Sequence, residues 1–289
     1  MNSAFRDVIF VNDMTLLRAW LLALGVAIIG SNLIEDFGLL GEDGLARQAF
    51  APISAIVGGY IFGLGIVMAG GCGSGVLYKQ GEGQFAAFIA TVGFVFTLIM
   101  SYHGPLAPVM KWIKSYKVSI GSGDDAIANP ALWDLFSAPN LKWVFIAVIV
   151  AIIIPIVWKG GPLGKQPKKG WSWSLGGLLV GLIIIIAWWT SYEWGGRARG
   201  LSFSGPLSEL VTFFMLGDSM AKNDQLFSIV GYGAISWSAL YIIGVPIGAF
   251  LSAKGLSEFK LTAPKQVDEL MRVFFGGMIM GVGGALAGG

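Results

Sequence analysis

The sequence predicts an all-α polytopic membrane protein whose internally duplicated, glycine-rich helices surround a central pathway. Only 12% of the 289 residues are charged and 55% are hydrophobic, whereas about 25% of the residues of a soluble domain are charged. Glycine occurs 43 times, about twice its usual share, which suits closely packed membrane helices or backbone that approaches a ligand. This composition argues against a soluble enzyme and against a disordered chain.

About eight apolar segments are expected to be helical, although not all are long enough for a full span of about 20 residues. In chain order they are Leu16–Leu33, Ile53–Ala69, Phe85–Tyr102, Trp143–Trp158, Leu175–Trp189, the shorter Leu207–Leu216, Leu226–Leu251 and Met271–Gly289. Met1–Met14 lacks the basic and apolar regions of a signal peptide. We therefore expect residues 1–289 to form a single integral membrane domain with several spans and no cleaved leader.

The loop at residues 159–169 sets the expected orientation. It carries four basic residues and no acidic one, namely Lys159, Lys165, Lys168 and Lys169. Such a loop favours the cytoplasmic side of the membrane. Counting spans back from it places Cys72–Gln84 on the cytoplasmic side. The sides assigned to the residues before Ile53 hold only if Ile53–Ala69 crosses the membrane and is not a re-entrant element.

An internal repeat is the most informative feature of the chain. Gly58–Gly71 reads GGYIFGLGIVMAGG and Gly276–Gly289, which lies 218 residues later, reads GGMIMGVGGALAGG; eight of the fourteen positions are identical. Duplicated membrane halves commonly place a substrate site on interrupted helices near the midplane. We therefore expect residues 58–75 and 276–289 to be repeated core elements, in either parallel or inverted orientation. Close helix packing is the alternative role for these glycines.

The first repeat continues into a glycine-rich turn that holds Cys72, the single cysteine. Exposed N–H groups and the positive dipole end of a restarting helix would make an anion site there. Lys79 could attract an anion, and Glu82 could set the position of Lys79. A thiolate about 4 Å from an anion would cost about 4 kcal/mol at an effective dielectric of 20, so a neutral thiol is expected. The alternative is a buried, inert cysteine.

The predicted pathway residues combine this turn with the end of the second repeat. They are Gly70, Gly71, Cys72, Gly73, Ser74, Gly75, Lys79, Glu82, Gly288 and Gly289. His103, the only histidine, has no second histidine or carboxylate beside it in the sequence. We expect no cofactor, no metal site and no catalytic residues. The formal net charge of +2 gives no reason to expect a nucleic-acid partner.

The string GGC-x-x-G-x-x-Y-K-x-x-E-G at Gly70–Gly83 resembles the YeeE/YedE family of bacterial inner-membrane sulfur-compound transporters. The SAFRD string at Ser3–Asp7 and the GGxxxGxGxxLAGG string at Gly276–Gly289 are similar to two further motifs of that family. The resemblance implies a multi-pass protein of the bacterial inner membrane that takes up a small sulfur-containing anion such as thiosulfate. It also implies that Cys72 is a thiol at the neck of the pathway, which relays the anion through S–H contacts with its sulfur.

Two departures from the family pattern accompany this resemblance. The other two family cysteines would fall just before Met1 and just after Gly289, so we expect either a fragment or a neighbouring chain that supplies them. A cytoplasmic sulfur-carrier protein is a partner by family analogy only. Three alternatives stay open: a membrane sulfurtransferase with a covalent persulfide on Cys72, a transporter of a selenium compound, and a structural membrane subunit.

Overall fold

The structure is a computed structural model of the chain. It describes all residues except 1, 42–43, 48, 50, 119–130, 132, 134–140, 163, 165–169, 221–225, 230–232 and 289. The chain divides into two compact units. Unit 1 comprises Met1–Phe50 and Ser119–Leu201, and unit 2 comprises Ala51–Val118 and Ser202–Gly289. That the two units form a single membrane domain stays a prediction.

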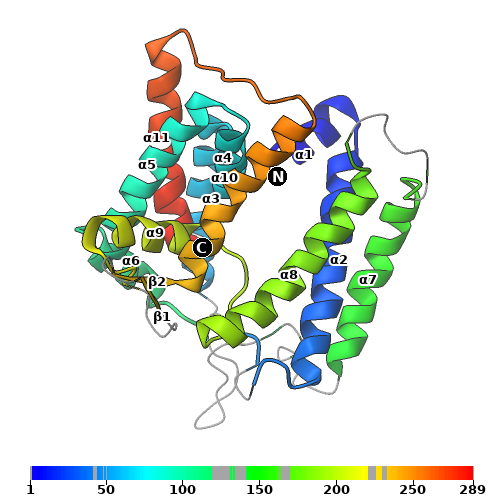
Figure 1. The fold of residues 1–289 in the computed structure, drawn as a ribbon. Helices are drawn as coiled ribbons and strands as arrows, with labels where there is room; N and C mark the ends of the chain where they lie inside the picture. The colour runs from blue at the N-terminus through cyan, green and yellow to red at the C-terminus, as the bar shows by residue number, and fades with distance from the viewer. Residues whose placement is uncertain are drawn as a thin grey trace. The chain divides into compact units, whose positions relative to one another are not determined.

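Unit 1 is helical in its described part. Its elements are α1 (Asn2–Arg6), the π-helical η1 (Asp7–Val11), α2 (Thr15–Asp36), α7 (Lys142–Trp158) and α8 (Trp173–Gly195) (Figure 1). Glycine brings α2 and α8 together, because a Cβ on Gly177 would lie 2.6 Å from the carbonyl oxygen of Ala19. The Nζ of Lys142, at the start of α7, lies 2.7 Å from Glu35 Oε2 and 2.8 Å from Asp36 Oδ1 at the end of α2.

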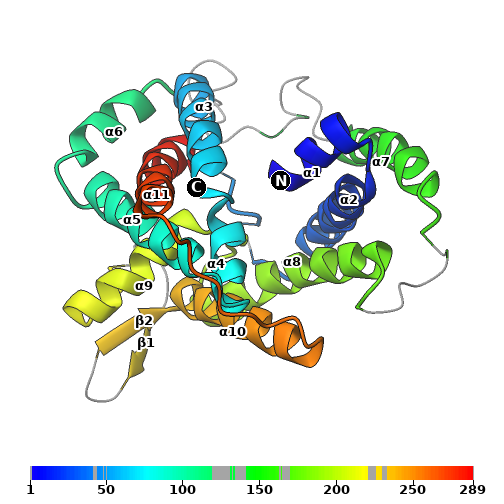
Figure 2. The ribbon, with the colours of Figure 1, turned by 90° about the horizontal axis from the view of Figure 1, so that it is seen from above.

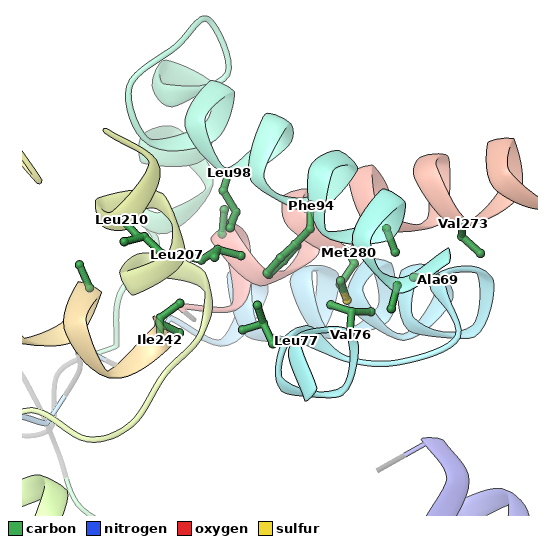
Figure 3. Close-up of a cluster of buried hydrophobic side chains, with 14 of the residues drawn as sticks. Ala69, Val76, Leu77, Phe94, Leu98, Leu207, Leu210, Ile242, Val273 and Met280 are labelled. Carbon is green, nitrogen blue, oxygen red and sulfur yellow. The ribbon is translucent and has the colours of Figure 1, made fainter. Parts of the chain in front are cut away.

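Unit 2 holds the repeated segments and the cysteine turn. Its elements are α3 (Pro52–Ala69), α4 (Gly73–Gly81), α5 (Phe85–Tyr102), α6 (Ala107–Lys114), α9 (Ser204–Leu216), β1 (Leu226–Ile229), β2 (Gly233–Ser236), α10 (Trp237–Gly255) and α11 (Val267–Ala287). Phe94 and Leu98 of α5 and Met280 of α11 have no exposed surface. These side chains lie with Val76 and Leu77 of α4 in one buried hydrophobic cluster (Figure 3).

The helices confirm a polytopic membrane protein. Among the described residues, six helices are long and apolar enough to cross a membrane: α2, the interrupted Pro52–Gly81 formed by α3 and α4, α5, α8, α10 and α11. α7 is apolar but shorter, with 17 residues. Of the basic loop that set the expected orientation, Lys165, Lys168 and Lys169 lie outside the described residues.

One predicted helix is wrong over the residues before Trp237. Leu226–Leu251 was expected to be helical throughout, but Leu226–Ile229 pairs with Gly233–Ser236 as an antiparallel hairpin. The helix begins only at Trp237, because Ser236 caps it: the N–H of Ala239 donates to Ser236 Oγ over 3.2 Å. Hydropathy alone does not separate a short apolar strand from the start of a helix.

The two glycine-rich segments pack as an antiparallel pair, and Figure 2 shows α3 beside α11. A Cβ on Gly58 would lie 2.5 Å from the backbone nitrogen of Ala287, and one on Gly276 would lie 2.5 Å from that of Ala69. The two contacts are equivalent under the repeat offset of 218: Gly58 corresponds to Gly276, and Ala287 corresponds to Ala69. A local two-fold axis therefore relates the contacts of α3 to those of α11.

A second pair of contacts obeys the same two-fold relation. A Cβ on Gly65 would lie 2.3 Å from the nitrogen of Met280, and one on Gly283 would lie 2.3 Å from the nitrogen of Phe62. Both helices thus meet backbone to backbone, which small residues permit. Since antiparallel helices are related by an axis perpendicular to their length, this geometry supports an inverted repeat in the membrane.

Candidate functional site

The Cys72 turn interrupts a membrane helix. α3 ends at Ala69, and Gly70 follows in the left-handed conformation with φ of 74°. Cys72 is extended, with φ of −77° and ψ of 179°, and forms the N-cap of α4. The chain therefore leaves one helix and starts another within the candidate span Pro52–Gly81. Glycine is needed at position 70 because other residues rarely adopt this backbone conformation.

Small residues let other elements approach this turn closely. A Cβ on Gly73 would lie 3.1 Å from Phe203 Cβ and 3.3 Å from a ring carbon of Phe94. A Cβ on Gly75 would lie 3.6 Å from Cys72 Sγ. The sulfur of Cys72 therefore lies over the first turn of α4, where the N–H groups of residues 73–75 have no partner within the helix.

The thiol of Cys72 is half-buried and has a polar neighbour. Cys72 Sγ lies 3.3 Å from Ser74 Oγ, and either atom could donate the hydrogen bond. When the Ser74 hydroxyl donates, the S–H of Cys72 is free to point at a ligand. The carbonyl of Cys72 accepts from the N–H of Val76 over 2.9 Å, which fixes the first turn of α4 beneath the thiol.

Lys79 is brought to the turn, but Glu82 does not position it. The Nζ of Lys79 donates to the carbonyl oxygen of Gly70 over 2.6 Å. Helical side chains lean toward the N-terminus of their helix, so Lys79 reaches back along α4. Glu82 follows the last residue of α4 and accepts from Gln84 Nε2 over 3.4 Å. The expected pairing of Glu82 with Lys79 is not among the ion pairs of the described residues.

The end of the second repeat copies the end of the first. α11 ends at Ala287, and Gly288 is left-handed with φ of 90°, as Gly70 is after α3. Gly289 lies outside the described residues. Because Ala69 lies level with Gly276 and Ala287 lies level with Gly58, the two helix ends are about 16 Å apart along the pair.

A segment that the sequence interpretation missed lies between these two ends. The first turn of α9 touches both repeats: Phe203 packs against Gly73, and a Cβ on Gly284 would lie 2.8 Å from Ser204 Oγ. Ser204 is only 5% exposed. A serine followed by Gly205 and Pro206 before an apolar run is a helix-start signal, so this second helix N-terminus could have been found from the sequence.

This arrangement is suited to an anion that carries sulfur. Two helix N-termini, those of α4 and α9, lie together and supply partial positive charge and free N–H groups. Val76, Leu77 and Phe94 lie with Ala69 in the buried hydrophobic cluster and have almost no exposed surface (Figure 3). A thiol in such surroundings offers a soft, polarisable contact.

Comparisons with known proteins agree on a family. A sequence profile of the sulphur transport family matches residues 1–289. Thiosulfate transporter TsuA of Spirochaeta thermophila is 29% identical over 295 residues, which cover 100% of this chain and 82% of that protein. Thiosulfate transporter TsuA of Escherichia coli is 28% identical over 309 residues, covering 100% and 78%. Probable transporter YedE of Escherichia coli is 33% identical over 111 residues, covering 38% and 26%.

Proposed function

We propose that this chain, which belongs to the sulphur transport family, takes up a small sulfur-containing anion such as thiosulfate across the bacterial inner membrane. The observation that carries the proposal is the break at Gly70–Cys72 within a membrane-spanning helix. Irregular backbone at that depth is tolerated only where it lines a cavity or is buried in protein. Two relatives that align with the whole chain are named thiosulfate transporters.

The selection of an anion is the task of the helix N-termini. The N–H groups of Gly73, Ser74 and Gly75 lie outside the internal bonding of α4, and the first turn of α9 adds Ser204 and Gly205. These donors favour negative charge without a fixed positive side chain. An anion bound in this way is held weakly enough to leave on the other side, as a facilitated pathway requires.

Recognition of sulfur is the task of Cys72. Its neutral S–H donates to the terminal sulfur of thiosulfate, while the Ser74 hydroxyl donates to Cys72 Sγ and orients the thiol. A thiolate would repel the anion by about 4 kcal/mol at 4 Å and an effective dielectric of 20. The contact therefore forms and breaks without a covalent bond. Gly288 supplies the matching left-handed backbone at the end of the second repeat.

Lys79 acts in this proposal by holding the turn and by attracting the anion from nearby. Its ammonium lies 2.6 Å from the carbonyl of Gly70, where it offsets the negative dipole end of α3. Glu82 contributes only to the local charge. The chain acts as a carrier and not as an enzyme, and a cytoplasmic sulfur-carrier protein could receive the anion.

The test is uptake of labelled thiosulfate into proteoliposomes by the full chain and by Cys72→Ala. Loss of the thiol should lower uptake at least tenfold while the melting temperature in detergent stays unchanged. Gly59→Ala is the matched control, because a Cβ at Gly59 meets no atom within 4 Å and should leave uptake intact. Equal uptake by Cys72→Ala and the parent protein would end the relay.

Mass spectrometry separates the relay from covalent chemistry. The protein is incubated with thiosulfate and digested without reductant. The relay predicts an unmodified Cys72, whereas a stoichiometric persulfide on Cys72 would refute the non-covalent step. Competition in the uptake assay identifies the preferred cargo. If the chain carries a selenium compound, unlabelled selenosulfate should inhibit the uptake of labelled thiosulfate at a lower concentration than unlabelled thiosulfate does.

A further inference from the structure

Unit 2 contains a pocket that the transport pathway does not use. Its volume is about 510 Å³, within the range of ligand pockets. It lies at the C-terminal end of α4, between α5 and α10. The lining is largely aromatic and aliphatic and comprises Gln80, Gly81, Gly83, Gln84, Phe85, Phe88, Pro246, Ile247, Phe250, Phe259 and Leu261.

The pocket is closed at one end by the extended segment 259–262. The N–H of Phe85 donates to Thr262 over 2.9 Å, and the N–H of Thr262 donates to Gly83 over 3.0 Å. Beside it, a Cβ on Gly81 would lie 2.3 Å from the carbonyl oxygen of Pro246, so α4 and α10 touch directly. Backbone contacts therefore fix this end of the pocket: segment 259–262 is hydrogen-bonded to the start of α5, and α4 packs directly against α10.

The other side of the pocket is exposed on two helices that are candidate membrane spans. Phe88 of α5 is 51% exposed and Ile247 of α10 is 53% exposed, and both helices are long and apolar enough to cross the membrane. The Cys72 thiol lies at the opposite end of α4, about 12 Å away along the helix. The pocket is thus separate from the anion site, and its apolar wall suits a hydrocarbon chain.

A positive charge lies at the closed end. The Nζ of Lys254, in the last turn of α10, lies 5.2 Å from the centre of the Phe250 ring, and that ring lines the pocket. Two carboxylates are in the same region: Glu82 accepts from Gln84, and Glu258 lies on the exposed turn after α10. Since Lys254 packs on the pocket wall itself, an anionic head group there would meet the cation directly.

We propose that this pocket binds an anionic phospholipid of the surrounding bilayer, with one acyl chain between α5 and α10 and the phosphate beside Lys254. Burial of an acyl chain stabilises binding in proportion to its length. A lysine at the membrane surface adds affinity for anionic lipid, and basic pockets between membrane helices bind anionic head groups. The lipid fastens the α4 end, the 259–262 segment and α10 together.

The test uses the full chain in phosphatidylcholine nanodiscs that contain a small fraction of phosphatidylglycerol with a photoactivatable acyl chain. Cross-links mapped by peptide mass spectrometry should concentrate on residues 85–92 and 246–250. Ile247→Trp, which fills the pocket, should lower labelling there severalfold. Lys254→Gln should lower it about fivefold, the equivalent of one surface lysine. Lys111→Gln, an exposed lysine of α6, is the matched control and should change nothing.

Two outcomes would overturn the proposal. A photoactivatable phosphatidylcholine that labels these residues equally well would show no preference for an anionic head group. Labelling spread evenly over exposed apolar residues such as Ile56 and Tyr60 of α3 would show ordinary bilayer contact. Melting temperatures check that the variants fold, and Phe88→Trp fills the pocket from α5 if Ile247→Trp does not fold. Uptake of thiosulfate is not the readout, so the result is independent of the proposed function.

Discussion

The glycines of α3 lie on two faces that should respond in opposite ways to the same substitution. Gly65 faces α11, where an added Cβ would lie 2.3 Å from the nitrogen and 2.5 Å from the Cα of Met280. Gly59 and Gly63 lie on another face, where a Cβ would meet no atom within 4 Å. We predict that Gly65→Ala destabilises the protein, whereas Gly59→Ala and Gly63→Ala do not.

The magnitude follows from these distances. Non-bonded heavy atoms pack best at about 3.5–4.0 Å, so the new methyl group on Gly65 would lie more than 1 Å too close to a backbone that cannot rotate away. Overpacking of this kind costs about 1–3 kcal/mol. Replacing glycine by alanine in a helix contributes up to about 1 kcal/mol of stability. Gly59→Ala and Gly63→Ala should gain this contribution, whereas in Gly65→Ala the cost of the clash should outweigh it.

The assay is thermal or denaturant unfolding of the full chain in detergent, followed by tryptophan fluorescence. One kcal/mol corresponds to a shift of about 2–4 °C for a protein of 150–250 residues, so Gly65→Ala should melt several degrees lower than Gly59→Ala. Gly283→Ala should match Gly65→Ala, because its contact with Phe62 has the same 2.3 Å distance. Equal melting temperatures for Gly65→Ala and Gly59→Ala would refute the packing argument.

Three further predictions concern the turn and unit 1. Ser74→Ala should lower the rate of thiosulfate uptake severalfold without changing the melting temperature, because the hydroxyl 3.3 Å from the Cys72 thiol is lost; unchanged uptake would remove Ser74 from the pathway. Lys79→Gln should lower uptake and Lys79→Arg should restore it in part, since the bond to Gly70 needs a long cationic donor; full activity of the glutamine variant would contradict this. Glu35→Gln should destabilise unit 1 by about 1–3 kcal/mol in unfolding experiments, because it weakens a hydrogen bond to the charged Lys142, and an unaltered unfolding curve would exclude that role.

Features that depend on local chemistry could be predicted from the sequence. Phe85–Tyr102 was expected as a helix and has these bounds in the structure, because it is predominantly apolar and lies between the Glu82–Gly83 turn and Gly104. The anion site at the glycine-rich turn depended on a helix that restarts after Cys72, and α4 does begin at Gly73. The membrane spans followed from runs of apolar residues, and the family and the transport class followed from short sequence motifs.

Features that depend on tertiary contacts could not be predicted in this way. Leu226–Ile229 and Gly233–Ser236 are apolar enough for a helix, but they pair as antiparallel strands, and the helix begins only after the Ser236 cap. Lys79 was expected to pair with Glu82, three residues away, but the carbonyl of Gly70 is within reach only because α3 and α4 are separated by a turn. The approach of Phe203 to Gly73 joins residues 130 positions apart, which no local pattern reveals.

The backbone contacts between α3 and α11 also limit how the protein can move. At Gly58, Gly65, Gly276 and Gly283 each helix meets main-chain or Cβ atoms of the other, and a change of side-chain rotamer moves none of these atoms. Sliding or tilting would separate these surfaces at every contact at once. The two helices should therefore move as one rigid unit during transport. In the proposed pathway, the passage of an anion would then require movement only of the first turns of α4 and α9, while α3 and α11 stay in place.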